Sequence, residues 1–351
     1  MIVVNYGNNI TENTYESLKI SDIHTYLRHE YNVALKPNLV NSNPASDGAT
    51  THPEVVEGII LFLKEYGVKS ISIIESSAIG YSTKRSFKNC GYENLSSKYN
   101  VPLYDLKNDN IIYKTHSGFQ LGLCSKALDT DFLINVPVLK SHCQTRMTCN
   151  LKNLKGCIPD DEKRRYHSMG LHKPIAALNA LMKTSYCVVD GICGDLSFEE
   201  GGTPVISNRI IVGHDPVMVD SFCAELIGYK PDDITHLKIA REIGVGKYFT
   251  PDTKVIEVNT ENKPLNKTTG SRLASRYQHL INDDSACSVC YSSLTYALYR
   301  LGGNFNGKIF IGQGYQGKNF DGTGIGNCTS GCRNYVPGCP PKAVDIINYL
   351  K

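Results

Sequence analysis

The residues with the clearest chemical signature are five of the thirteen cysteines, which lie close together near the end of the chain. They occur as Cys287-Ser-Val-Cys290, then Cys328, Cys332 and Cys339, and two prolines follow the last one. Thiolates are soft ligands that suit iron, and a Cys-x2-Cys loop directs two of them at one metal face. The spacing therefore predicts a [4Fe-4S] cluster in this stretch.

Three other uses of these cysteines have to be weighed. A structural zinc ion also takes four thiolates, but usually as two pairs of similar spacing, and only Cys287 and Cys290 are spaced in that way. Disulfides need an oxidising compartment, and residues 1–6 show no export signal. Ordinary buried cysteines would not be expected to cluster among glycines. A zinc site is the second interpretation of these cysteines, after a [4Fe-4S] cluster.

The cysteine motifs resemble those of a known family. Cys287-Ser-Val-Cys290, Gly326-Asn-Cys328 and Pro-Gly-Cys339-Pro-Pro are similar to the cluster-binding motifs of the nickel-iron hydrogenase small subunit and its relative in respiratory complex I. The match is confined to these motifs, and the intervals between them are shorter here. The resemblance implies that Cys287, Cys290, Cys328 and Cys339 are the four ligands. Cys332 would be a spare thiol that could replace Cys328, lie beside the cluster or react itself.

A second group of chemically capable residues lies between positions 140 and 173, where cations and histidines are dense. Lysine donors beside a glycine suit a phosphate or carboxylate group, and histidine can move protons near neutral pH. We therefore expect a small anionic substrate here, with Lys140, His142, Lys155 and His167 as candidate catalytic residues. The alternative is a basic, solvated loop.

The elements that must position these residues alternate between strand and helix over the first 140 residues. Short apolar runs predict strands at 2–5, 33–40, 70–75, 101–104 and 132–136, and helical periodicity predicts helices at 12–30, 54–66 and 83–99. This alternation predicts an α/β fold, with a mainly parallel sheet and helices on both of its faces. Ligands of such sheets bind beyond the carboxyl ends of the strands.

Polar residues follow several of the predicted strands. Lys36-Pro-Asn38, Glu75-Ser-Ser and Pro137-Val-Leu-Lys140-Ser-His142 each stand at a strand end, and a further strand ends in an acid. Polar residues at one strand end would be interpreted as a solvated loop, whereas polar residues at several strand ends indicate a binding site. The candidate substrate-binding residues are Lys36, Asn38, Lys152, Asn153 and Asp190.

Three other segments have weaker signals. The acidic, glycine-rich loop at 195–204, with Glu199 and Glu200, could close over a ligand or coordinate Mg²⁺, although most such loops do neither. Asp215 precedes a proline and is predicted to cap a helix. The glycines from Gly312 onward fit a dinucleotide fingerprint, but turn residues follow them in place of a helix, so that function is rejected.

A second resemblance covers most of the chain. The family called domain of unknown function 362 is closely resembled in six segments, which are Lys36-Pro-Asn38, 135–142, 151–156, 189–191, 215–220 and 236–240. Members often carry iron-sulfur motifs beside this core, and no general reaction is assigned to them. The resemblance supports the α/β fold and directs attention to six positions, which are Lys140, His142, Lys152, Asn153, Lys155 and Asp190.

The chain of 351 residues exceeds the usual size of one domain. A polar, turn-rich stretch at 259–271 predicts two units, an α/β core domain at 1–265 and an iron-sulfur region at 272–351. The net charge of +3 argues neither for nor against nucleic acid, and because no long Lys/Arg run occurs, a nucleic-acid partner is not expected. No apolar run approaches the roughly 18 residues of a membrane helix, so a cytoplasmic protein is expected.

These observations predict an iron-sulfur oxidoreductase that acts on a small anionic substrate and has an electron-donor protein as a partner. Two alternatives stay open. One is an electron carrier or cluster-handling protein without a substrate of its own, and the other is a non-redox lyase or sulfur-transfer enzyme that uses the cluster. Most of the chain lies outside the cysteine region, which favours an enzyme over a carrier.

Overall fold

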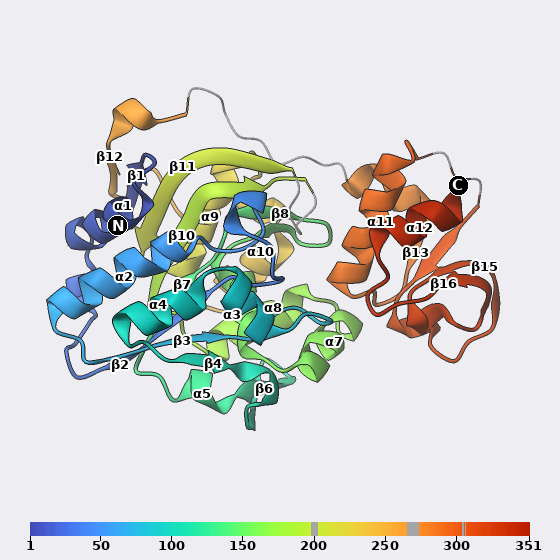
Figure 1. The fold of residues 1–351 in the computed structure, drawn as a ribbon, viewed down its shortest axis with the longest axis horizontal. Coiled ribbons are helices and arrows are strands. Elements are labelled where there is room, and N and C mark those ends of the chain that lie inside the picture. The colour runs from blue at the N-terminus through green and yellow to red at the C-terminus, as the bar shows by residue number, and fades with distance from the viewer. Residues whose placement is uncertain (198–202, 265–273, 304, 306) are drawn as a thin grey trace.

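The structure, a computed structural model, describes residues 1–197, 203–264, 274–303, 305 and 307–351. At its centre lies an eight-stranded sheet (Figure 1). In spatial order its strands are β12 (Val255–Val258), β1 (Ile2–Tyr6), β11 (Pro204–Gly213), β10 (Tyr186–Asp195), β7 (Phe132–Val136), β2 (Asn32–Pro37), β3 (Ser70–Glu75) and β4 (Leu103–Asp105). Only β11 runs against its neighbours. The predicted α/β class with a mainly parallel sheet is confirmed.

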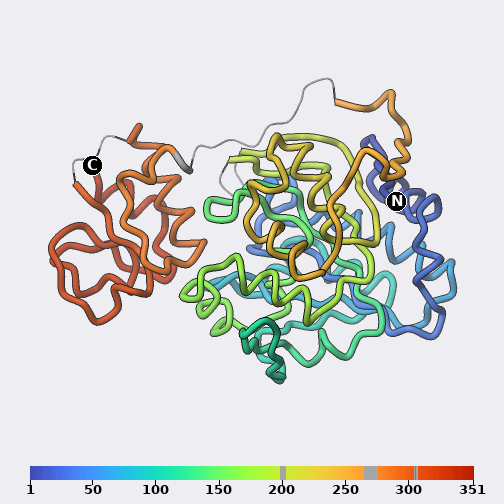
Figure 2. The backbone as a smooth tube through the Cα atoms, turned by 180° about the vertical axis from the view of Figure 1, so that it is seen from behind, coloured from blue at the N-terminus to red at the C-terminus, as the bar shows by residue number. Residues whose placement is uncertain are grey.

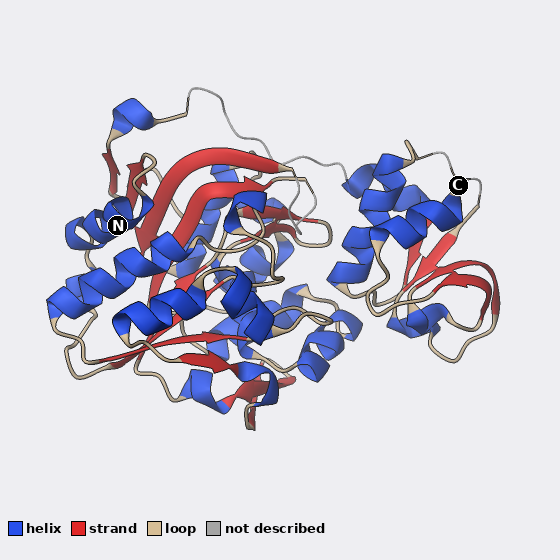
Figure 3. Cartoon of the chain, viewed as in Figure 1, coloured by secondary structure: helices blue, strands red, loops and turns tan. Residues whose placement is uncertain are grey.

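Each face of the sheet buries its own hydrophobic cluster, as Figure 3 shows by the helices on either side. Side chains alternate along a strand, so Val3 of β1 packs in one cluster while Ile2 and Val4 pack in the other. The first face is covered by α1 (Ile10–Ile20), α2 (Pro53–Tyr66), α3 (Thr83–Asn89) and α4 (Tyr92–Tyr99). The second is covered by α5 (Ser125–Leu128), α6 (Asn150–Asn153), α7 (Asp160–Ser168), α8 (His172–Leu181), α9 (Pro216–Leu226) and α10 (Thr235–Glu242).

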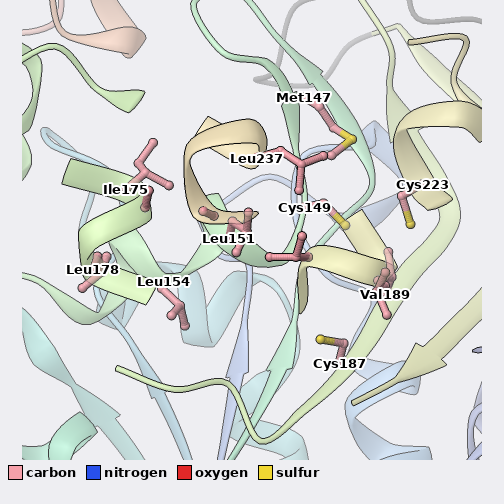
Figure 4. Packing of buried hydrophobic residues seen from close by; sticks show 14 of the residues in the cluster. Met147, Cys149, Leu151, Leu154, Ile175, Leu178, Cys187, Val189, Cys223 and Leu237 are labelled. Carbon is pink, nitrogen blue, oxygen red and sulfur yellow. The ribbon is translucent and has the colours of Figure 1, made fainter. Parts of the chain in front are cut away.

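The core of the second face contains five cysteines, which are Cys124, Cys149, Cys157, Cys187 and Cys223. Cys149, Cys187 and Cys223 pack among aliphatic side chains such as Leu151 and Val189 (Figure 4). Burial raises the pKa of Cys187 well above its ordinary value, because a thiolate would lack solvent there. These thiols therefore act as small apolar groups.

Local sequence signals explain where several elements begin and end. Helix α2 begins with Pro53 and ends before Gly67, whose φ of 93° is favourable only for glycine. The side chain of Asp215 accepts hydrogen bonds from Val217 N and Met218 N at 2.8 and 3.0 Å, which confirms the predicted cap of α9. The predicted strands 70–75 and 132–136 match β3 and β7.

Other predictions differ from the structure. The predicted helix 83–99 is two helices, because Gly91 between α3 and α4 has a φ of 82°. Helix α1 stops at Ile20, well before the predicted end at Glu30. Two hairpins were not predicted, β5 (Ile111–His116) with β6 (Phe119–Cys124) and β8 (Lys140–His142) with β9 (Arg146–Thr148).

The C-terminal part of the chain has a sheet and a hydrophobic cluster of its own, seen beside the main body in Figure 2. Its four parallel strands are β13 (Ile281–Asp283), β14 (Ile309–Ile311), β15 (Phe320–Ile325) and β16 (Cys332–Val336), and its helices are α11 (Ser288–Arg300) and α12 (Ala343–Leu350). The glycines after β14 lie around a short 3₁₀ turn, Gln313–Tyr315, and the strand β15 follows them in place of an α-helix, which agrees with the rejection of a dinucleotide site. We call residues 274–351 the C-terminal unit.

Hydrogen bonds join this unit to the main body. Gln144 Nε2 donates to Ala286 O at 3.0 Å, Ser288 Oγ donates to Gln144 Oε1 at 2.7 Å, and Gln313 Nε2 donates to Arg164 O at 3.0 Å. The predicted boundary between 265 and 272 falls outside the described residues, so the domain limits stay a prediction. None of the described helices combines the length and apolar character needed to span a bilayer.

Candidate functional site

A cavity of about 100 Å³ opens where the carboxyl ends of β2 and β3 meet the C-terminal unit. One wall is formed by residues 287–289 at the start of α11. The other walls contain five lysines, which are Lys36, Lys140, Lys152, Lys155 and Lys163. We call this space the lysine cavity. Its place agrees with the rule that open α/β sheets bind ligands beyond the carboxyl ends of their strands.

Lys36, at the end of β2, is fixed by a buried network. Its Nζ donates to Glu75 Oε2, Asn153 Oδ1 and Pro37 O, each at 2.8 Å. Asn153 Nδ2 in turn donates to Asn135 Oδ1 at 2.8 Å. The network ties the ends of β2, β3 and β7 to α6, because each of these elements supplies one of its members.

Gly156 lets the backbone pass directly over this network. It lies in a 3₁₀ turn, η4 (Leu154–Cys157), and a side chain there would overlap Glu75 Oε1 and come within 2.5 Å of Lys36 Nζ. Only a residue without Cβ fits this close approach. Gly156 belongs to the predicted anion-binding stretch. In the structure it allows the close packing of the cavity wall.

Lys163 was not among the predicted site residues. It lies on α7, and its Nζ donates to Ser76 Oγ at 2.6 Å, Ser77 O at 2.8 Å and Asp160 Oδ1 at 3.2 Å. Burial lowers the pKa of Lys163 to about 8, although the charge of Asp160 opposes that change. The signal that could have indicated it is its i, i+4 spacing to His167, since both then face one side of a helix.

Lys155 and His167 meet in the wall of the lysine cavity. Lys155 Nζ and His167 Nε2 are 3.4 Å apart, and both residues line the cavity together with Cys287. Two groups that can each hold a proton thus lie within reach of one another and of a bound ligand. Both were predicted as catalytic residues, and the structure brings them together.

Three further predicted residues line the same cavity. Lys140 Nζ donates to Ala49 O at 2.9 Å, Lys152 is half-buried on α6, and Asn38 is held through its main chain by Thr51. Glu75 is the one acidic residue among the described residues of the wall, and it is paired with Lys36. The lining therefore favours anions over cations.

His142 and Asp190 are not among the residues that line the lysine cavity. His142 Nδ1 accepts hydrogen bonds from Gln144 N and Thr145 N at 3.0 and 3.1 Å, in the turn of the β8–β9 hairpin. Asp190 Oδ2 accepts from His52 N and contacts His52 Nδ1, both at 2.8 Å. Burial alone would lower the pKa of His52, but the charge of Asp190, its hydrogen bond and the charge of Glu54 together raise the pKa.

The four cysteines assigned by resemblance lie on separate segments of the C-terminal unit. Cys287 is the N-cap residue of α11, Cys290 is in its first turn, and Cys328 is in the 3₁₀ turn η9 (Asn327–Thr329). A Cβ on Gly326, just before that turn, would lie 4.0 Å from Cys290 Sγ. Cys339 is exposed in the loop between β16 and α12.

The cysteines are close enough to influence one another electrostatically. Burial raises the pKa of Cys287 to about 11, the charges of Cys328 and Cys339 act in the same direction, and those of Lys155 and Arg164 oppose it. Among the described residues, however, no three His, Cys, Asp or Glu side chains are grouped closely enough to hold a single metal ion. The four thiols thus form a loose group that adjoins the lysine cavity.

Cys332 differs from the other four. It is buried at the start of β16, and its Sγ donates to Gly322 O at 2.8 Å. The Cys332 thiol therefore forms a hydrogen bond within the four-stranded sheet of the C-terminal unit. Glu199 and Glu200 of the predicted acidic loop lie outside the described residues.

The fold and this site define a two-part α/β protein with a lysine-lined cavity between a mainly parallel sheet and a cysteine-bearing unit. The model of the family described as "Domain of unknown function (DUF362)" matches residues 33–225, more than half of the chain, and the chain belongs to that family. The matched residues include every element of the main body that lines the cavity.

Individual relatives are similar over parts of the chain. A thylakoid-associated protein of Synechocystis sp. is 36% identical over 135 residues, which cover 38% of this chain and 41% of the relative. The lactate racemase apoprotein of Thermoanaerobacterium thermosaccharolyticum has a TM-score of 0.43 at 13% identity, covering 64% of this chain and 57% of its own. A structural-genomics protein of Thermotoga maritima has a TM-score of 0.43 at 12% identity, covering 68% and 60%.

Proposed function

We propose that this protein is an iron-sulfur oxidoreductase that binds a small anionic substrate in the lysine cavity. The observation that carries the proposal is the shared wall, since the cavity that contains five lysines is also lined by Cys287. The proposed [4Fe-4S] cluster would be held by Cys287, Cys290, Cys328 and Cys339. A bound anion would then lie beside the redox group.

The donor set fits a cluster better than a single ion. Zinc binds thiolates at about 2.3 Å, so four zinc ligands must converge closely. The described cysteines do not converge in that way, yet Cys328 and Cys339 are near enough to raise the pKa of Cys287. Separate loops that present thiols around a wider space suit a cofactor of several atoms.

The chain's own residues define what could happen to a substrate. The ammonium groups of the cavity would orient an oxyanion by charge-assisted hydrogen bonds. Lys155 Nζ and His167 Nε2, 3.4 Å apart, can hold a proton and pass it to the ligand or accept it back. When bound, the cluster would supply single electrons.

The test is the metal content of protein that is purified without oxygen. We expect iron and acid-labile sulfide in equal amounts in the wild type and in Cys332→Ala. The loss of either in Cys287→Ala, Cys290→Ala, Cys328→Ala and Cys339→Ala should be nearly complete. Colourless protein that contains zinc or no metal would refute the cluster. Iron loss in Cys332→Ala would show that the ligand set is wrong.

A further inference from the structure

The cysteine group reaches from the lysine cavity to the protein surface. Cys287 lines the cavity, whereas Cys339 is exposed. A cofactor held between them would have one side next to the substrate and the other next to solvent. This inference rests on the proposed function, and it concerns the side that faces solvent.

The main body contributes to the surface around Cys339. A Cβ on Gly80 would lie 3.2 Å from Cys339 O and 2.6 Å from Pro340 Cδ, so the loop before α3 packs against the cysteine loop. Helix α3 begins at Thr83, three residues after Gly80. The start of α3 therefore lies near the cysteine loop.

Exposed basic side chains occur on both segments that meet here, α3 and the start of α12. Lys84, Arg85 and Lys88 are exposed on α3, and Lys342 is exposed at the N-cap of α12, three residues after Cys339. We call these four residues the basic rim. None of them forms an ion pair with a described residue, and the one acid in the first turn of either helix is Asp345.

We propose that the basic rim is the docking site of a small acidic electron-carrier protein. Complementary charge speeds the encounter of two proteins and orients them, which suits a carrier that binds and leaves repeatedly. Docking at the rim places the carrier next to Cys339, at the exposed side of the cysteine group. One electron leaves the reduced carrier, which is oxidised, and reduces the cluster; no group is transferred.

The binding experiment uses the full chain and an oxidised plant-type ferredoxin as the acidic probe. Calorimetric titration at low salt should give a Kd that rises at least tenfold in Lys84→Glu/Arg85→Glu. The matched control is Lys64→Glu/Lys69→Glu, which reverses two exposed charges where α2 ends and β3 begins, at the amino edge of the sheet. We expect less than a twofold change in Kd for this control, and weaker binding of the wild type as salt is raised.

The outcomes separate this inference from the proposed function, because iron is measured in the same samples. Ferredoxin binding that depends on the rim in iron-free protein would support the rim and refute the cluster. If the protein contains iron but binds no ferredoxin, the docking site at the basic rim is refuted and the cluster is not. The same holds if the rim variant and the control variant bind ferredoxin with equal Kd. A single-stranded oligonucleotide that binds the rim more tightly than ferredoxin would overturn it as well. Thermal unfolding of each variant checks that it is folded.

Discussion

Lys36 and Glu75 form an ion pair that is almost fully removed from water, since both side chains are 2% exposed. Such a pair is stable only if its remaining hydrogen-bonding capacity is used, and here Asn153 and Pro37 supply the other acceptors of Lys36. The pair therefore shapes the floor of the lysine cavity. Direct contact of Lys36 with substrate stays a prediction.

Gly156 offers the sharpest test of that arrangement. Gly156→Ala should lower the free energy of unfolding by about 2–3 kcal/mol, because the new methyl group overlaps the buried ion pair. The measurement is the midpoint of urea unfolding. The control is Gly118→Ala, which meets no atom within 4 Å and adds only the left-handed backbone cost of about 1 kcal/mol. An equal loss in both variants would contradict the close packing.

The lowered pKa of Lys163 should make the stability of the protein depend on pH. Its folded pKa of about 8 lies below the ordinary 10.5, so the unfolded chain binds more protons between these values. The stability of the wild type relative to Lys163→Met should therefore rise as pH increases from 8 to 10.5, by roughly 3 kcal/mol at most. Unfolding in urea at several pH values measures the difference. A constant or falling difference would show that Lys163 is not desolvated.

The residues of the cavity were predictable to different degrees. Lys36, Asn38 and Glu75 could be found because they lie at the ends of strands of a parallel sheet, and such ends meet at one edge. Lys140 could be found because it follows β7 by four residues, although it belongs to the hairpin strand β8. His142 lies in β8, and the strand predicted to end at Asp190 continues as β10 to Asp195, so neither residue stands where the prediction placed it. A tight turn holds His142 and a partner histidine holds Asp190. A sequence pattern carries no information about those local partners.

At the scale of elements, helix α6 depends on a residue from a distant helix. Asp220 of α9 accepts hydrogen bonds from Asn150 N and Asn150 Nδ2, both at 2.9 Å, and from Leu151 N at 3.0 Å. A carboxylate at this position satisfies the orphan N–H groups of the helix start. Lys152 and Asn153 of the cavity are thereby held in place.

Asp220→Ala should consequently cost more than loss of an ordinary cap. We expect a decrease of about 2–3 kcal/mol in the free energy of unfolding, because buried N–H groups lose a charged acceptor. Asp215→Ala, which removes the partly exposed cap of α9, should cost about 1 kcal/mol. Both values follow from urea unfolding. A smaller effect for Asp220 than for Asp215 would contradict its role.

Elements with strong local signals were predicted well, and those set by long-range contacts were not. Helix α2 has an apolar stripe, a proline at its start and a glycine at its end, so its limits follow from sequence. Strand β11 pairs antiparallel with β1 and β10. Its direction depends on which neighbours it finds, and no residue of 204–213 encodes that choice locally.

At the scale of the whole molecule, the site exists only where two separately packed parts meet. Helix α7 lies on the side of the main body that faces the C-terminal unit (Figure 1), and it supplies both Lys163 and His167 to the lysine cavity. The sequence predicted the α/β main body and the C-terminal unit separately. Their contact could not be predicted, because the hydrogen bonds of Gln144 and Gln313 join segments more than a hundred residues apart.

One spectrum tests the claim that a cluster lies beside an anion site. Electron paramagnetic resonance of the protein, reduced electrochemically without oxygen, is recorded with and without saturating inorganic phosphate. We predict a reduced [4Fe-4S] signal that phosphate alters in the wild type and leaves unchanged in Lys152→Ala/Lys155→Ala. Absence of any iron-sulfur signal would contradict the account.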